Sequence, residues 1–288
     1  TSVLWLWLGT LGEERVVLAE QGQQNNVCLV LSTGEVVDIS NVGQDEVKLD
    51  KGTKLYEGNR LEYVQPDSLH KKELEFNQLI IPKGTFYHLV LSDGTKVWLN
   101  ADSELKYPVR FVGGKREVYL KGEGYFQVSK DSCRQFIVHL QNSEITVLGT
   151  AFNVSAYEDE AHVYTTLEEG RVVFYSRQNK QRILLKPGMQ SDMEVATGKT
   201  VVSEVDPSLY SAWIEGRFVF QSLDLESILR QLQRWYDFEV FFQQQEVKNY
   251  RFRGVLSRDM DIRQALDIIE ETTDLKFDIK GKTILVRK

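Results

Sequence analysis

The sequence contains little cysteine, histidine or proline, and these shortages narrow its possible functions. Its 288 residues include two cysteines, four histidines and five prolines, and no low-complexity tract. Cys28 and Cys133 are 105 positions apart and belong to no CxxC pattern. We expect them to be small apolar side chains on strands or loops, with a disulfide as the alternative that an exporting compartment would permit.

The motifs that carry most enzyme chemistry are also missing. No two histidines stand at metal-ligand spacing, and there is no GxSxG, Walker or cysteine–histidine pattern. Residues 122–124 (GEG) lack the third glycine of a dinucleotide loop. The adjacent acids at 159–160 and 168–169 would point to opposite faces of a strand, so they would not form an acid/base pair. The sequence therefore predicts no catalytic site, no metal and no cofactor.

The charge distribution argues against nucleic acid as a partner. The net charge is −7, and residues 207–288 contain 13 basic and 13 acidic side chains, so the acidic excess lies in residues 1–206. Neither part has the positive surplus that a phosphate backbone requires. With 42% hydrophobic and 27% charged residues, the composition is that of a globular protein long enough for two domains.

Short β-type segments separated by glycine-containing turns dominate the first 206 residues. Around the middle of the chain, the expected strands are residues 88–91, 96–99, 109–112, 117–120 and 125–128. The turns between them fall at residues 92–95, 113–114 and 122–124, where glycine permits positive φ. Residues 29–34 (LVLSTG) echo residues 89–94 (LVLSDG) at an offset of 60, which indicates that one strand–turn–strand unit is used twice. The β pattern continues to residue 202.

After residue 206 the apolar period changes from two to about 3.6. Residues 225–236 and 262–269 have the pattern of amphipathic helices, and they align at an offset of 37 that places Leu229 on Leu266. Strand-like segments flank each helix, which predicts the order β-α-β followed by β-α-β-β. Both leucines are expected to point into the core of this unit.

Each expected helix has a recognisable start. Ser222 or Asp224 is placed as the N-cap of the first helix. Asp261 and Gln264 are placed as a capping pair for the second. These local signals support the helical interpretation independently of the apolar period.

Five segments in one order carry a family resemblance: LSDGTKVWLNADSELKYP, KGEGYFQVSKD, ITVLGTAFNVSAY, TTLEEGRVVF and LLKPGMQ. This order resembles the periplasmic domain of FecR-type anti-sigma factors, the Bacteroidetes kind in particular, over roughly residues 76–190. Gly124 stands where that family more often has alanine. Residues 212–240 are similar to the secretin and TonB short N-terminal domain, which these proteins carry at their C-terminal end.

The resemblance implies a domain organisation and a location. We expect a mainly β protein with an antiparallel or solenoid-like all-β domain at 76–206 and a small α+β domain at 207–288. Residues 1–75 are expected to be a β segment with a connection, which either stands apart or belongs to the β domain. The chain would be the periplasmic domain of a single-pass inner-membrane protein. Residues 3–8 (VLWLWL) are too short to span a membrane. They are either a buried strand or the outer end of the membrane helix.

The resemblance also implies partners. The signalling domain of an outer-membrane TonB-dependent transporter would bind this chain. A cytoplasmic part, absent here, would then release an extracytoplasmic-function sigma factor. The alternative is a periplasmic glycan-binding β module without a signalling role, which would need tyrosine or tryptophan side chains exposed together.

The candidate partner-binding residues lie on two expected strands of the C-terminal domain, at residues 217–220 and 250–255. A small domain of this kind must leave strand edges free, and an added strand could pair there. Arg251 and Arg253 would face outward, opposite Tyr250 and Phe252. The expected contacts are Arg251, Arg253, Tyr250 and Arg217, and the alternative is an ordinary solvated strand face.

Overall fold

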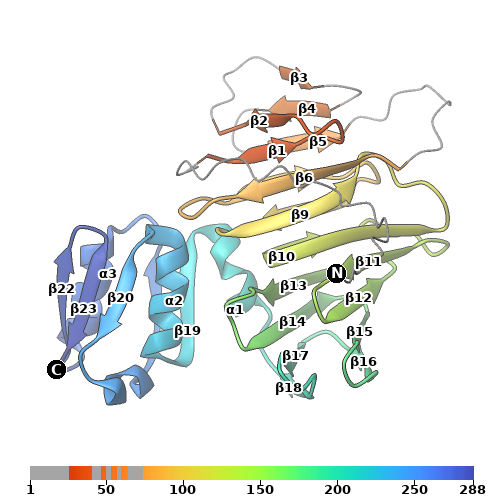
Figure 1. Ribbon diagram of the computed structural model, residues 1–288. Coiled ribbons are helices and arrows are strands. Elements are labelled where there is room, and N and C mark those ends of the chain that lie inside the picture. Colours follow the sequence, from red (N-terminus) through yellow and green to blue (C-terminus); the bar gives the residue numbers. More distant parts are fainter. Residues whose placement is uncertain (1–25, 41–46, 50–52, 57–59, 64–73) are drawn as a thin grey trace, which may run out of the picture.

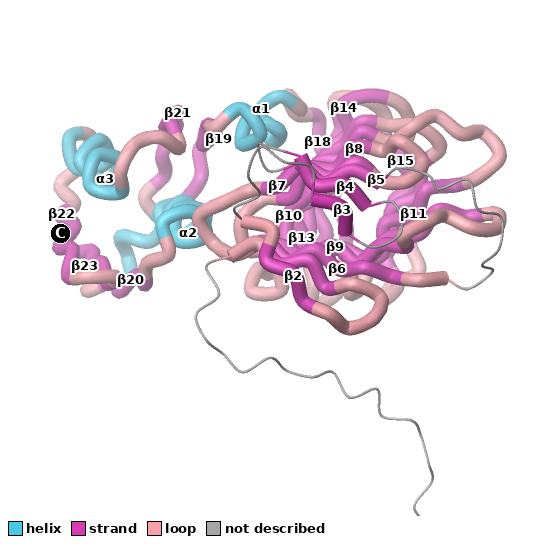
Figure 2. Tube along the Cα trace, turned by 90° about the horizontal axis from the view of Figure 1, so that it is seen from above, coloured by secondary structure: helices cyan, strands magenta, loops and turns pink. Residues whose placement is uncertain are grey.

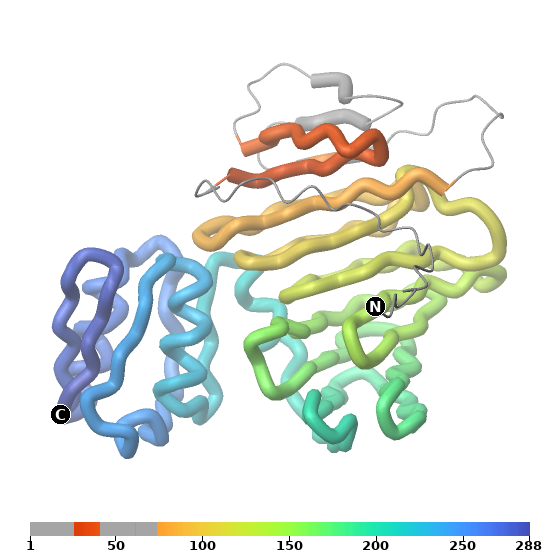
Figure 3. The backbone as a smooth tube through the Cα atoms, viewed as in Figure 1, coloured from red at the N-terminus to blue at the C-terminus, as the bar shows by residue number. Residues whose placement is uncertain are grey.

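The computed structural model describes residues 26–40, 47–49, 53–56, 60–63 and 74–288. It confirms a mainly β chain in which a large β domain precedes a small α+β domain (Figure 1). Figure 3 follows the backbone from the orange and green β domain through a cyan connection into the blue C-terminal domain. The apolar run at residues 3–8 lies outside the described residues.

The β domain consists of two sheets that share one strand. In the first sheet the order is β2 (Val36–Asp38), β1 (Cys28–Val30), β6 (Phe76–Ile81), β9 (Ser103–Pro108), β10 (Lys115–Gln127), β11 (Gln135–His139), β12 (Ser143–Val147), β15 (Val172–Ser176) and β16 (Arg182–Leu185). In the second sheet it is β3 (Val47–Leu49), β4 (Thr53–Tyr56), β5 (Arg60–Tyr63), β7 (Tyr87–Val90), β8 (Lys96–Leu99), β10, β13 (Ala151–Ala156), β14 (His162–Glu169), β17 (Met189–Glu194) and β18 (Thr200–Glu204). All of these pairs are antiparallel except β10–β11 and β5–β7.

The core of the β domain lies between the two sheets. Phe126 on β10 packs against Phe136 of the first sheet and Phe152 of the second, with ring centroids 6.2 and 5.2 Å apart. All three side chains are fully buried. Because side chains alternate along a strand, the neighbours Tyr125 and Asn153 project from the outer face of the second sheet.

Strand β10 corrects the predicted second hairpin. Residues 109–112 are not a strand, and the partner of β10 is instead β9, whose sequence SELKYP carries no β-branched residue. Residues 122–124 are not a turn either, because β10 runs through them and passes there from the first sheet to the second. Gly122 makes this bend with φ of +84°. A glycine in the sequence therefore indicates that the chain bends, but the bend can be either a turn or a bent strand.

Replacing Gly122 with alanine should destabilise the β domain by about 1–3 kcal/mol, because a side chain disfavours this φ. The added Cβ would also lie 2.7 Å from the carbonyl oxygen of Asp102 and closer still to Oγ of Ser103. Urea denaturation measures the loss. Gly114→Ala is the matched control, since no atom lies within 4 Å of its Cβ position. Equal stability of the two variants would contradict the account of the bend.

The predicted repetition of one strand–turn–strand unit is confirmed. In the β1–β2 unit, Leu31 N–H donates to Glu35 O at 2.8 Å and Gly34 N–H to Leu31 O at 2.9 Å. The β7–β8 unit repeats both bonds 60 residues later with the same lengths. Its glycine, Gly94, has φ of +81°, against +86° at Gly34. One turn geometry therefore serves both sheets.

The C-terminal domain has the predicted element order. Its elements are β19 (Arg217–Asp224), α2 (Leu225–Tyr236), β20 (Glu239–Phe242), η3 (Gln245–Asn249), β21 (Arg251–Ser257), α3 (Ile262–Glu271), β22 (Lys276–Lys280) and β23 (Thr283–Arg287). Strands β19 and β21 form one antiparallel sheet, and β20, β23 and β22 form another. The two helices lie between these sheets (Figure 2), and all of these layers contribute to one apolar cluster.

Both helix starts are also confirmed. Asp224, rather than Ser222, caps α2 by accepting a hydrogen bond from Ser227 N–H at 2.9 Å. Asp261 and Gln264 form a reciprocal capping box at the start of α3. Each bond satisfies a backbone group that the first helical turn leaves without a partner.

Candidate functional site at the domain junction

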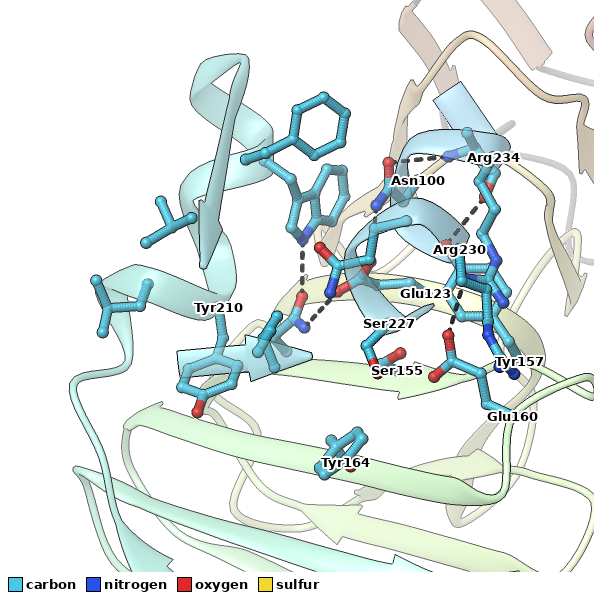
Figure 4. A pocket seen from close by; sticks show the side chains of 18 of the residues that line it. Asn100, Glu123, Ser155, Tyr157, Glu160, Tyr164, Tyr210, Ser227, Arg230 and Arg234 are labelled. Carbon is cyan, nitrogen blue, oxygen red and sulfur yellow. Dashed lines mark hydrogen bonds and ion pairs between the residues drawn. The ribbon is translucent and has the colours of Figure 1, made fainter. Parts of the chain in front are cut away.

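The two domains meet at the outer face of the second sheet. A short connection, α1 (Ser208–Ser211) and η2 (Ala212–Glu215), leads from β18 to β19. Trp213 of this connection is 6% exposed. A cavity of about 380 Å³ lies beside it, with walls from β13, β14, α1, β19 and α2 (Figure 4).

A carboxylate and two amides form the floor of the junction. Glu123 follows the bend of β10, and its two carboxylate oxygens accept hydrogen bonds from Asn100 Nδ2 at 2.7 Å and Asn153 Nδ2 at 2.9 Å. An ionised carboxylate only accepts hydrogen bonds, so each amide must turn its nitrogen toward it. Both amide oxygens are thereby directed to other donors.

Those donors come from the C-terminal domain and its connection. Arg258 Nη1 donates to Asn100 Oδ1 at 3.0 Å, and Trp213 Nε1 donates to Asn153 Oδ1 at 3.1 Å. Arg258 follows β21 and is 7% exposed. One carboxylate of the β domain therefore orients the two amides that hold the second domain in place.

The side chain of Arg258 is held by aromatic rings as well as by its hydrogen bond to Asn100. Its guanidinium carbon lies 4.4 Å from the ring centre of Trp235 and 4.8 Å from that of Phe218. Burial lowers the pKa of Arg258 to about 10, so the side chain is still a cation at neutral pH. Burial likewise raises the pKa of Glu123, while the two amides and the charge of Arg258 act against that rise. The charge of Arg258 therefore favours the ionised form of Glu123, and the charge of Glu123 favours the protonated form of Arg258.

A second polar contact joins α2 to the β13–β14 turn. Arg234 is 5% exposed and contacts Asp159 at 2.6 Å and Glu160 at 2.8 Å. Its guanidinium carbon lies 3.7 Å above the ring centre of Tyr157. Gly84 N–H also donates to the backbone oxygen of Arg234 at 2.9 Å. The end of α2 is therefore fixed to the β domain by side-chain and main-chain bonds.

The residues that the sequence singled out for partner binding are not all brought together. Arg251 and Arg253 are exposed on β21, and Tyr250 and Phe252 pack against the apolar cluster of the C-terminal domain, which is the expected alternation. Arg217 lies at the other end of this two-stranded sheet, because β19 pairs Arg217 with Ser257 and Asp224 with Arg251. Arg217 contacts Glu215 and lines the cavity.

Sequence reasoning missed the junction residues. Asn100 and Arg258 are separated by 158 positions, and no local spacing connects them. The signals available were polar side chains, such as Asn153, inside strands that are otherwise apolar. Such a residue indicates a buried partner but does not identify it.

Several classes of site receive no support from the part of the chain that the structure describes. No group of three or more histidine, cysteine, aspartate or glutamate side chains there could hold a metal ion. None of the described helices has the length and apolar character to cross a membrane. The structure has no disulfide between Cys28, which is buried on β1, and Cys133, which is exposed.

Comparison with known proteins gives two family matches and two similar structures. The family described as FecR protein matches residues 77–173, and that described as FecR, C-terminal matches residues 217–286. Two crystal structures of a candidate anti-sigma factor from Parabacteroides distasonis ATCC 8503, at 1.65 and 2.50 Å resolution, each show 25% identity and a TM-score of 0.69. The similarity covers 73% and 74% of this chain and 98% and 99% of the other chain. No curated protein matches the sequence.

Proposed function

Because the chain belongs to the family of FecR-type anti-sigma factors, we propose that it is the periplasmic signalling part of a regulator anchored in the inner membrane. The signalling domain of an outer-membrane TonB-dependent transporter binds it from the periplasmic side. A cytoplasmic part of the same regulator then controls an extracytoplasmic-function sigma factor. In this proposal the chain binds the signalling domain of the transporter and transmits that binding event to the rest of the regulator, and it catalyses no reaction.

The observation that carries the proposal is the buried polar junction between the domains. An apolar interface would tolerate small shifts, whereas oriented hydrogen bonds between Glu123, Asn100 and Arg258 hold only in one arrangement. A partner that displaces the C-terminal domain must exchange these bonds for others. The structure has one hydrogen-bonded arrangement of the junction, and we propose that partner binding replaces it by a second, which transmits the binding event.

The docking site in this proposal is the exposed strand edge of the C-terminal domain. Among the described residues, β21 pairs only with β19, so its outer edge presents backbone groups without a strand partner. Arg251, Arg253 and Val255 are exposed beside that edge, and Val255 is 57% exposed. A transporter domain could add a strand there and place acidic side chains against the two arginines.

Charge reversal at both positions, Arg251→Glu with Arg253→Glu, tests the docking site. The affinity for the signalling domain of a transporter encoded beside this protein should fall at least tenfold in calorimetry, because attraction becomes repulsion at the interface. The melting temperature should change little, since both side chains are exposed and Arg251 makes one surface hydrogen bond to Ser222 O.

The matched control carries the same charge change on the other sheet, Lys280→Glu with Arg287→Glu. Both side chains are exposed, and the pair between Arg287 and Asp278 lies at the surface. The control should bind like the unaltered protein. Unchanged affinity of the Arg251 and Arg253 variant would remove this strand from the interface, and full binding by residues 26–206 alone would place docking elsewhere.

A further inference from the structure

The cavity at the junction has a lining whose charged groups already have partners. Arg234 contacts Asp159 and Glu160, and Arg217 contacts Glu215. The carboxylate of Glu123 accepts two amide hydrogen bonds and lies within the field of the Arg258 cation. The Nε atoms of Arg234 and Arg258 have no hydrogen-bond partner among the described residues, but both atoms are buried and do not face the open space. A charged ligand would therefore have to break one of the arrangements above, so the lining does not favour an ion.

The polar groups that remain available are neutral. Ser155 projects from β13, Ser227 and Gln231 from α2, and Gln221 from β19, and all four line the cavity. Among the described residues, none of these four side chains makes a hydrogen bond to the protein. Each hydroxyl or amide both donates and accepts, and the four come from both domains. They match a ligand whose hydroxyl groups also donate and accept.

Two tyrosine rings also line the cavity. Tyr164 on β14 and Tyr210 on α1 are half-buried, and Figure 4 shows Tyr164 below and Tyr210 to the left of Ser155 and Ser227. Burial raises the pKa of Tyr164 to about 12, so its hydroxyl is a neutral donor at neutral pH. Ring faces pack against the C–H surface of a sugar while ring edges and hydroxyls remain polar. The volume of about 380 Å³ falls within the range of small-molecule sites.

We propose that this cavity binds a small neutral saccharide, held between Tyr164 and Tyr210 and hydrogen-bonded to Ser155, Gln221, Ser227 and Gln231. Because its walls belong to both domains, an occupied cavity stabilises the present arrangement of the domains relative to any other. The saccharide would thus act as an effector that shifts the equilibrium between arrangements of the two domains. Saccharide binding in this cavity does not require docking by a transporter.

The test uses the full chain without a protein partner and a panel of neutral disaccharides: maltose, cellobiose, lactose and N,N′-diacetylchitobiose. Calorimetry and saturation-transfer NMR should detect at least one of them with a Kd of about 1 mM or tighter. Tyr164→Ala should weaken that binding about tenfold, through loss of the ring contact. Gln231→Ala should weaken it about fivefold through one hydrogen bond, and because Gln231 is exposed, this variant keeps the fold.

Tyr175→Ala is the matched control, because Tyr175 is a half-buried tyrosine of the first sheet outside the cavity. It should leave the affinity unchanged. Absence of binding by all four neutral disaccharides at about 10 mM would overturn the proposal. So would binding that neither Tyr164→Ala nor Gln231→Ala weakens, or a preference for digalacturonic acid. A peptide from the transporter that competes for the same tyrosines would assign the cavity to protein binding instead.

Discussion

Replacing Arg258 with methionine should lower the free energy of unfolding by about 3 kcal/mol at neutral pH. Methionine retains much of the volume but leaves the carboxylate of Glu123 without its nearby cation. It also removes the hydrogen bond to Asn100 and the contacts with the rings of Trp235 and Phe218. We expect urea denaturation to show two transitions in place of one as the domains lose their coupling.

The loss should depend on pH in a defined direction. Burial already raises the pKa of Glu123 above its ordinary value of 4.5, and removal of Arg258 raises it further. A raised carboxyl pKa in the folded state means that ionisation opposes folding. This cost is absent below the ordinary pKa and grows as the pH rises through the folded-state pKa. The variant should therefore lose less stability near pH 5 than near pH 8.

Arg253→Met is the matched control for this experiment, because Arg253 is an exposed arginine of the same domain. It should change stability by about 0.5 kcal/mol or less at either pH. An Arg258→Met protein with one transition and a pH-independent loss would contradict the coupling of the two charges.

Truncation of either equivalent helix leucine, Leu229→Ala or Leu266→Ala, should cost about 2–5 kcal/mol. Both side chains are fully buried in the apolar cluster of the C-terminal domain, between its two sheets. Each truncation removes apolar contact and leaves a cavity that the surrounding strands cannot fill. Thermal or urea denaturation followed by circular dichroism measures the loss.

The outer face of α3 supplies the comparison for these truncations. Ile268 is 39% exposed, so Ile268→Ala should cost less than about 1 kcal/mol. A loss below about 1 kcal/mol at both leucines would mean that the apolar cluster contributes little to stability, and it would contradict the packing described above.

The sequence predicted the C-terminal domain better than the β domain for a physical reason. A helix repeats its apolar positions every 3.6 residues and begins with a cap, so α2 and α3 carry redundant local signals. Strands β9 and β17 lack such signals, since SELKYP and MQSDME contain few β-type residues. Their place is fixed by pairing with distant strands. The division of the chain at 206 and 207 stays a prediction, which limited proteolysis near the connection would test.

The junction could not be predicted from local patterns at all. Glu123 lies on β10, Asn153 on β13 and Asn100 directly after β8, and their hydrogen bonds depend on the register of the second sheet. Arg258 reaches them only because the small domain docks on that face. The alternation of Arg251 with Phe252, by contrast, is a property of one strand, and the sequence was sufficient to predict it.

Strand β10 has a mechanical consequence for the β domain. It is hydrogen-bonded to β9 and β11 in one layer and to β8 and β13 in the other. Sliding one layer over the other would break ladder bonds along both halves of this strand, so the sandwich resists shear. Glu123 lies in the second half of β10, and Arg116 lies in the first half of the same strand. The buried guanidinium of Arg116 contacts Asp93 at 2.7 Å. A force applied to the two amides of the junction is therefore transmitted to β10, a strand that is hydrogen-bonded in both sheets.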